Sequence, residues 1–140
     1  MIQKLKKNKK GFTLVELLVV LVILAILAAA IIPSMMGFID KAKEESHAAE
    51  CRNVALAADI VINELYGKGS LKEDTTLDAT EVQKIAGVKG TPSNLTVAKD
   101  GTHFYLKTAN YVTSGSNPKT YYYVATSATE SSWSTTPPTA

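Results

Sequence analysis

The chain has 140 residues, 46% of them apolar, with 15 lysines and arginines against 13 acids. This length allows one small domain and excludes a large multidomain enzyme. Five of the lysines lie within residues 1–10, so the rest of the chain carries 10 basic against 13 acidic residues, a net charge of −3. A mildly acidic body argues against a protein that binds nucleic acid through bulk positive charge. The single cysteine excludes a disulfide within the chain.

An apolar segment follows the basic start. Residues 17–32 contain no polar side chain, and residues 12–39 contain few. A run of this length is typical of a membrane helix or a signal peptide. The exceptions within residues 12–39 are Thr13, Glu16, Pro33, Ser34 and Gly37.

Residues 40–66 are predicted to continue as an amphipathic helix. One apolar stripe recurs at steps of three and four residues: Cys51, Val54, Ala55, Ala58, Val61, Ile62 and Leu65. Together with the apolar segment it predicts a helix over residues 12–66, about 80 Å long at 1.5 Å per residue. A 140-residue globule cannot enclose such a helix, so we expect part of it to project. Gly67 is expected to take the left-handed position at its end.

The remaining chain predicts a small α+β head over residues 67–125. Asp78 and Glu81 resemble the capping box of a short helix that ends at Gly87. An Asp-Gly pair between two β-prone runs predicts a hairpin with strands at residues 95–98 and 103–107, and residues 120–125 predict a third strand. Residues 126–140, rich in Ser and Thr, are expected to cross the surface or to lack structure.

Two simple interpretations of the N-terminus leave features unexplained. A secretory signal peptide cut near Ala30 gives no reason for the apolar residues that follow it. A plain membrane anchor with the lysines in the cytoplasm accounts for the length. It leaves Glu16 without a role, although ionisable residues in such segments usually have a partner and a function.

The residues Gly11, Phe12, Thr13, Leu14, Val15 and Glu16 directly after the lysines resemble the prepilin signature of the type IV pilin family, which includes the pseudopilins of secretion and competence systems. The resemblance covers residues 1–41. It implies that residues 1–11 are a leader, that a prepilin peptidase cuts between Gly11 and Phe12, and that the new amine of Phe12 is methylated. It also implies a lollipop fold, with a long N-terminal helix packed on a small antiparallel sheet.

The resemblance further implies roles for residues in the apolar segment. Glu16 would pair with the amine of an adjacent subunit and so register one subunit against the next. Pro33 and Gly37 would mark a helix break. An unpaired buried charge costs roughly 3–5 kcal/mol, which makes the pair a suitable register device. The residues expected to pack in a filament core are Leu14, Leu17, Leu18, Val20, Leu21, Leu24, Ala25 and Ala28.

The function implied is that of a structural subunit rather than an enzyme. Subunits wait in the cytoplasmic membrane with the C-terminus outside, then polymerise into a surface pilus that serves adhesion, surface motility or DNA uptake. Expected partners are other pilins, the prepilin peptidase, an assembly ATPase and a membrane platform protein. The resemblance is to a type IVa-like major pilin. Many pilins close the head with a disulfide, so the lone cysteine suggests a head held by sheet packing, as in pilins of Gram-positive bacteria. The alternatives are a pseudopilin and a membrane-anchored binding domain.

Other candidate sites have simpler explanations. His47 and Cys51 have a metal-compatible spacing, but two ligands do not close a site, so we predict neither metal nor cofactor. The sequence contains no catalytic motif that we recognise. Tyr105, Tyr111 and residues 121–123 are predicted to be half-buried strand residues. A surface that stacks bases of single-stranded nucleic acid is the alternative.

Overall fold

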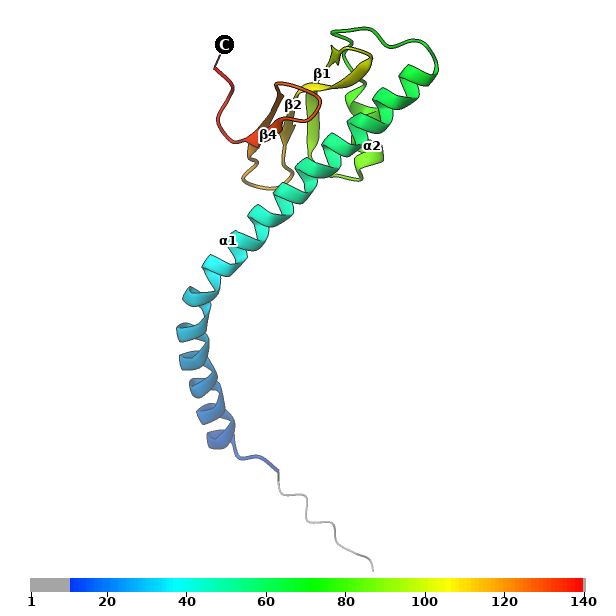
Figure 1. Ribbon diagram of the computed structural model, residues 1–140. Coiled ribbons are helices and arrows are strands. Elements are labelled where there is room, and N and C mark those ends of the chain that lie inside the picture. The colour runs from blue at the N-terminus through cyan, green and yellow to red at the C-terminus, as the bar shows by residue number, and fades with distance from the viewer. Residues whose placement is uncertain (1–10, 140) are drawn as a thin grey trace, which may run out of the picture. The chain divides into compact units, whose positions relative to one another are not determined.

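The computed structural model describes residues 11–139. Its elements follow the order of one long helix, one short helix and four strands (Figure 1). Helix α1 runs from Leu14 to Gly67, 54 residues, which confirms the predicted long helix to within two residues at each end. The chain divides into two compact units, one up to Ala42 and one from Lys43 onward. The second unit contains the core.

The second half of α1 supplies one wall of that core. Its buried residues are Cys51, Val54, Ala57, Ala58, Val61 and Ile62, and Ala55 and Leu65 pack at their margin. The predicted stripe is therefore confirmed, with Ala57 added to it. This buried face consists only of small and β-branched side chains, which lets the helix lie close to the other core residues.

The end of α1 differs from the prediction for Gly67. Gly67 is still helical, and the left-handed residue is Gly69, with a φ of 68°. The Gly69 N–H donates to the Tyr66 carbonyl and the Ser70 N–H donates to the Leu65 carbonyl, the two bonds of a Schellman motif. Both glycines suit a helix end, and the hydrogen bonds select the one two residues later.

Four antiparallel strands form one sheet in the order β1-β2-β3-β4 (Figure 1). The strands are β1 (Thr91–Asp100), β2 (His103–Val112), β3 (Thr120–Ala125) and β4 (Ser131–Ser134). The long helix on this sheet confirms the α+β fold. The hairpin forms as predicted: Asp100 pairs with His103, and Gly101 takes a φ of 59° in the two-residue loop.

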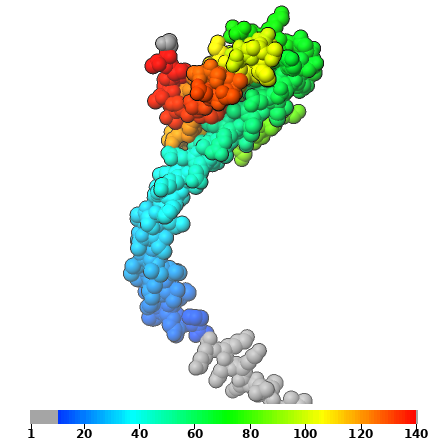
Figure 2. Space-filling model, in the orientation of Figure 1, coloured from blue at the N-terminus to red at the C-terminus, as the bar shows by residue number. Residues whose placement is uncertain are grey.

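The strand limits depart from the sequence in two places. Strands β1 and β2 extend beyond the strands predicted at residues 95–98 and 103–107. Their pairing is irregular between Ser93 and Val97, as in a β-bulge, and regular pairs continue on both sides of this irregularity. Strand β4 lies within the predicted tail and pairs with β3 through Tyr123 and Trp133. In the space-filling view the C-terminal residues form one surface with the preceding turn and strand (Figure 2).

Helix α2 (Ala79–Ala86) has the predicted ends, with Asp78 as N-cap, but the full capping box is not formed: among the described residues the Glu81 carboxylate does not accept from the Asp78 N–H. The Asp78 carboxylate accepts from the Thr80 N–H at 2.8 Å, and Gly87 is left-handed with a φ of 65°. The helix buries Val82 and packs against β1. The residues of the sheet and linker that complete the core are Leu77, Leu95, Val97, Leu106, Ala109 and Tyr111.

Candidate functional site

Helix α1 begins with a reciprocal pair of side-chain hydrogen bonds. The Glu16 N–H donates to the Thr13 Oγ1 at 3.3 Å, and the Glu16 Oε2 accepts from the Thr13 N–H at 2.9 Å and from its hydroxyl at 3.0 Å. This is a capping box, which satisfies backbone donors that the first turn leaves without partners. This capping box was not predicted, although its Thr-x-x-Glu spacing is visible in the sequence.

The capping box leaves part of the Glu16 side chain available. Both Thr13 donors bind Oε2, and within residues 11–139 no group donates to Oε1. A carboxylate can accept about four hydrogen bonds. The geometry therefore allows Glu16 to cap its own helix and to accept from a second group at once.

The predicted processing site lies at Gly11 and Phe12, before the first helical residue. The Phe12 side chain is 85% exposed, and a Cβ placed on Gly11 would meet no atom within 4 Å. The described part of the chain thus imposes no steric requirement for glycine at this position. The remainder of the predicted leader lies outside the described residues.

The apolar part of α1 is exposed along its whole length. An 18-residue window is long and apolar enough to cross a membrane, and none of it is buried within the chain. The exposed fraction ranges from 79% for Leu14 to 45% for Val20. An apolar surface of this size requires cover from lipid or from other chains. The packing of the predicted filament-core residues against other copies of the chain stays a prediction.

Helix α1 continues through Pro33 and Gly37 without interruption. Pro33 has no N–H to donate to the carbonyl four residues earlier, which weakens the helix there. The Ser34 hydroxyl donates to the Ile31 carbonyl at 2.8 Å, a bond that often accompanies bending. The predicted break is therefore not present in the single chain, and loss of helicity during assembly stays a prediction.

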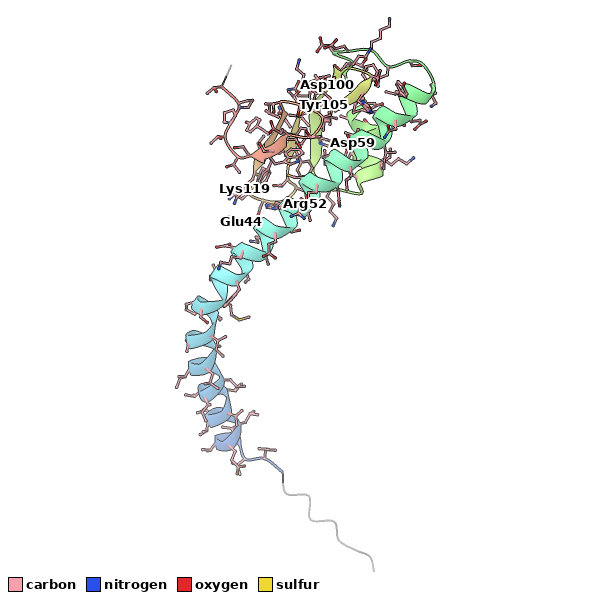
Figure 3. The ribbon with its side chains drawn as sticks, viewed as in Figure 1. Glu44, Arg52, Asp59, Asp100, Tyr105 and Lys119 are labelled. Carbon is pink, nitrogen blue, oxygen red and sulfur yellow. The ribbon has the colours of Figure 1, made fainter. Side chains whose placement is uncertain are left out.

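A second group of polar residues joins α1 to the loop between β2 and β3. The Lys119 Nζ lies 3.8 Å from the Glu44 Oε1, and both side chains are largely exposed (Figure 3). The Tyr121 hydroxyl lies 3.4 Å from the His47 Nδ1. These contacts hold the loop side of the sheet to the helix, and they form no catalytic arrangement.

Cys51 and Tyr111 are buried titratable groups inside the core. Cys51 is 2% exposed, and burial, with the nearby Glu50 carboxylate, raises its pKa to about 12. Burial likewise raises the pKa of Tyr111 to about 12, and its hydroxyl accepts from the Gly90 N–H at 3.2 Å. A thiol with so high a pKa is a poor nucleophile and a poor metal ligand. Among the described residues, His47 and Cys51 belong to no group of three or more side chains that could bind a metal ion.

The tyrosines do not share one surface. Tyr111 is fully buried, whereas Tyr105 and the three tyrosines of β3 are half-buried. Tyr123 packs against Trp133, with ring centroids 5.2 Å apart. Trp133 was not singled out in the sequence, although it is the only tryptophan and the only large apolar residue of the tail. These side chains therefore do not form one exposed aromatic surface on which the bases of a nucleic acid could stack.

No curated protein and no solved structure matches the chain, whereas one family model does. Residues 6–32 match the family described as the prokaryotic N-terminal methylation motif. The matched segment contains Gly11, Phe12, the capping box and most of the apolar run. The chain therefore carries an N-terminal motif typical of type IV pilins and pseudopilins.

Proposed function

We propose that this chain is a pilin, a structural subunit that polymerises into type IV pili on the bacterial surface. A prepilin peptidase removes residues 1–11 and methylates Phe12. The subunit is held in the cytoplasmic membrane by the apolar part of α1 until an ATPase and a platform protein add it to the fibre. Adhesion, surface motility or DNA uptake are then activities of the assembled fibre.

One observation carries the proposal: the methylation motif coincides with an apolar helix segment that stays exposed among the described residues. Lipid covers such a surface before assembly, and neighbouring helices of the same kind cover it afterwards. In lipid, close helix packing depends on small residues, which Ala25 and Ala28 supply. No enzymatic site is needed in this account.

Glu16 gives the assembly a charge-based register. Removal of the leader takes away five lysines and creates one amine, on Phe12, four residues before Glu16. The Oε1 atom, which Thr13 does not use, is free to accept from the amine of a neighbouring subunit. Breaking such a pair would leave a buried charge, at a cost of roughly 3–5 kcal/mol, so misplaced subunits are disfavoured.

Mass spectrometry of the native chain tests the proposal. A chain that begins at methylated Phe12 supports it. An intact Met1 would instead identify a plain membrane anchor, and a chain cut near Ala30 a secreted protein. Abundant sheared fibres of this chain distinguish a major pilin from a pseudopilin, which would give few or short fibres together with a secretion or transformation defect.

A further inference from the structure

The outer face of α1 in the second unit carries charges of alternating sign. Glu45, Arg52 and Asp59 are spaced seven residues apart and are all exposed. Seven residues fall only about 20° short of two helical turns, so the three side chains lie in one row along the helix. Arg52 and Asp59 can be followed along α1 in Figure 3.

This row is not used within the chain. The ion pairs of the described residues are Glu64 with Lys68, Asp74 with Lys107, and Glu44 with Lys119, and none includes a member of the row. The same helix face carries apolar surface, because Leu56, between Arg52 and Asp59, is 62% exposed. The corresponding position between Glu45 and Arg52 is Ala49, which is also exposed.

We propose that this row, Glu45, Arg52 and Asp59, is an interface between copies of the chain, in which neighbouring parallel helices are offset by seven residues. The inference rests on the proposed function, since subunits that enter a fibre from one membrane share one orientation. With this offset, Arg52 of one copy lies beside Glu45 of the next copy and Asp59 of the previous one. An offset of zero or of fourteen residues would bring like charges together.

The apolar side chains of the row fit the same offset. A shift of seven residues places Leu56 of one copy opposite Ala49 of the next, a large side chain against a small one. The shift corresponds to about 10.5 Å along the helix axis. Beside Arg52, Leu56 and Asp59, an open hollow of about 410 Å³ extends to Tyr123 and Trp133, which leaves this side of the helix accessible.

Charge exchange tests the interface. Arg52→Glu gives three acids in the row and turns both contacts of each subunit from attractive to repulsive, so we expect a drop of about tenfold or more in sheared fibres. The triple variant Glu45→Arg, Arg52→Glu, Asp59→Arg restores opposite charges at the same offset and should restore the fibres. Lys84→Glu, on the exposed face of α2, is the matched control and should assemble normally.

A fibre yield that is unchanged in Arg52→Glu, or as low in the triple variant as in Arg52→Glu, would overturn the interface.

Cross-linking provides an independent measurement on fibres with the charges intact. Cysteines at positions 49 and 56 of one helix lie about 10.5 Å apart, too far to form a disulfide within the chain. The double variant Ala49→Cys, Leu56→Cys should therefore give a ladder of covalent multimers on oxidation, and each single variant should not.

The two proposals fail in different ways. Abundant fibres with a methylated Phe12 but without the cross-linked ladder would overturn the seven-residue offset and leave the pilin function standing. Absence of fibres together with an intact Met1 would overturn the pilin function itself.

Discussion

At the scale of single residues, Glu16 caps its own helix, and in the proposed fibre it would also pair with a neighbouring subunit. Its Oε2 closes the first turn of α1 through Thr13, and its Oε1 is the atom available to another subunit. The resemblance to pilins predicts a role for the negative charge of Glu16, but it does not predict the capping box with Thr13. The two tasks can be separated, because glutamine also serves at the third position of a capping box.

We therefore predict different effects for two substitutions at Glu16. Glu16→Gln keeps the cap and loses the charge, so assembly should fail while the precursor remains in the membrane. Glu16→Ala loses both, and its helix start should in addition fray. Fibre yield and the helical signal in detergent measure the two effects. Normal fibres from Glu16→Gln would show that the cap, rather than the charge, is what assembly requires.

A second residue-scale prediction concerns two glycines, Gly67 in the last turn of α1 and Gly90 just before β1. A Cβ on Gly90 would collide with the Val112 carbonyl oxygen and the Tyr111 hydroxyl, whereas a Cβ on Gly67 would meet nothing within 4 Å. Gly90→Ala should lower the free energy of unfolding by about 2–3 kcal/mol through overpacking. Gly67→Ala, the matched control, should raise it by about 0.5–1 kcal/mol through helix propensity. Denaturant unfolding of both variants in detergent checks the difference in sign.

At the scale of elements, local signals predicted most of the fold. Asp78 and Gly87 fix both ends of α2 by their own hydrogen-bond chemistry, and residues 120–125 form β3 as expected. The Gly67 prediction was wrong because two glycines competed for one helix end, and hydrogen bonds to Leu65 and Tyr66 decided between them. Strand β4 was not predicted because it consists mainly of serines, whose pairing depends on β3 rather than on their own propensity.

Trp133 should be the side chain that holds β4 in place. Its ring packs against Tyr123 and against the margin of the core, so Trp133→Ala should lower the free energy of unfolding by about 1–2 kcal/mol. Ser132→Ala, one residue away on the exposed side of the strand, should have little effect. Denaturant titration followed by circular dichroism compares them. Equal stability of both variants would mean that the C-terminal segment adds nothing to the head.

At the scale of the whole molecule, local signals in the sequence are easier to recognise than contacts between chains. Gly11, Phe12 and Glu16 were singled out because they follow one another closely in a signature that resembles that of prepilins, and the matched motif includes all three. The packing of Leu14 and Leu24 could not be predicted in the same way, because both side chains are exposed and their proposed partners are other copies of the chain. If the charged row of α1 is completed only by assembly, as proposed, a single sequence shows its spacing but none of its contacts.

The stability of the head should fall in alkaline solution. Folding raises the pKa of Cys51 to about 12, so above pH 9 the unfolded chain releases a proton that the folded chain retains. Stability is then unaffected below pH 9 and declines above it, by up to about 1.4 kcal/mol per pH unit for each such group. Tyr111, whose pKa also rises to about 12, contributes only from about pH 10.

The two contributions can be separated by substitution. Cys51→Ala should remove the decline between pH 9 and pH 10 and roughly halve the slope above pH 10, where Tyr111 alone then contributes. The fluorescence of the single tryptophan, Trp133, reports unfolding in denaturant at each pH. A wild-type midpoint that stays constant from pH 8 to pH 11 would contradict the burial of both groups.

Helix α1 supplies both the apolar run and one wall of the head core, without a loop between them. Tension applied to the N-terminal part of such a subunit meets one weak point in α1, the turn before Pro33, where a backbone hydrogen bond is missing. Beyond that turn the pull is carried by continuous helix into the buried row around Val54, Ala58 and Val61. Mechanical strength of the fibre would therefore be set by side-chain interdigitation inside each subunit as well as by the contacts between subunits.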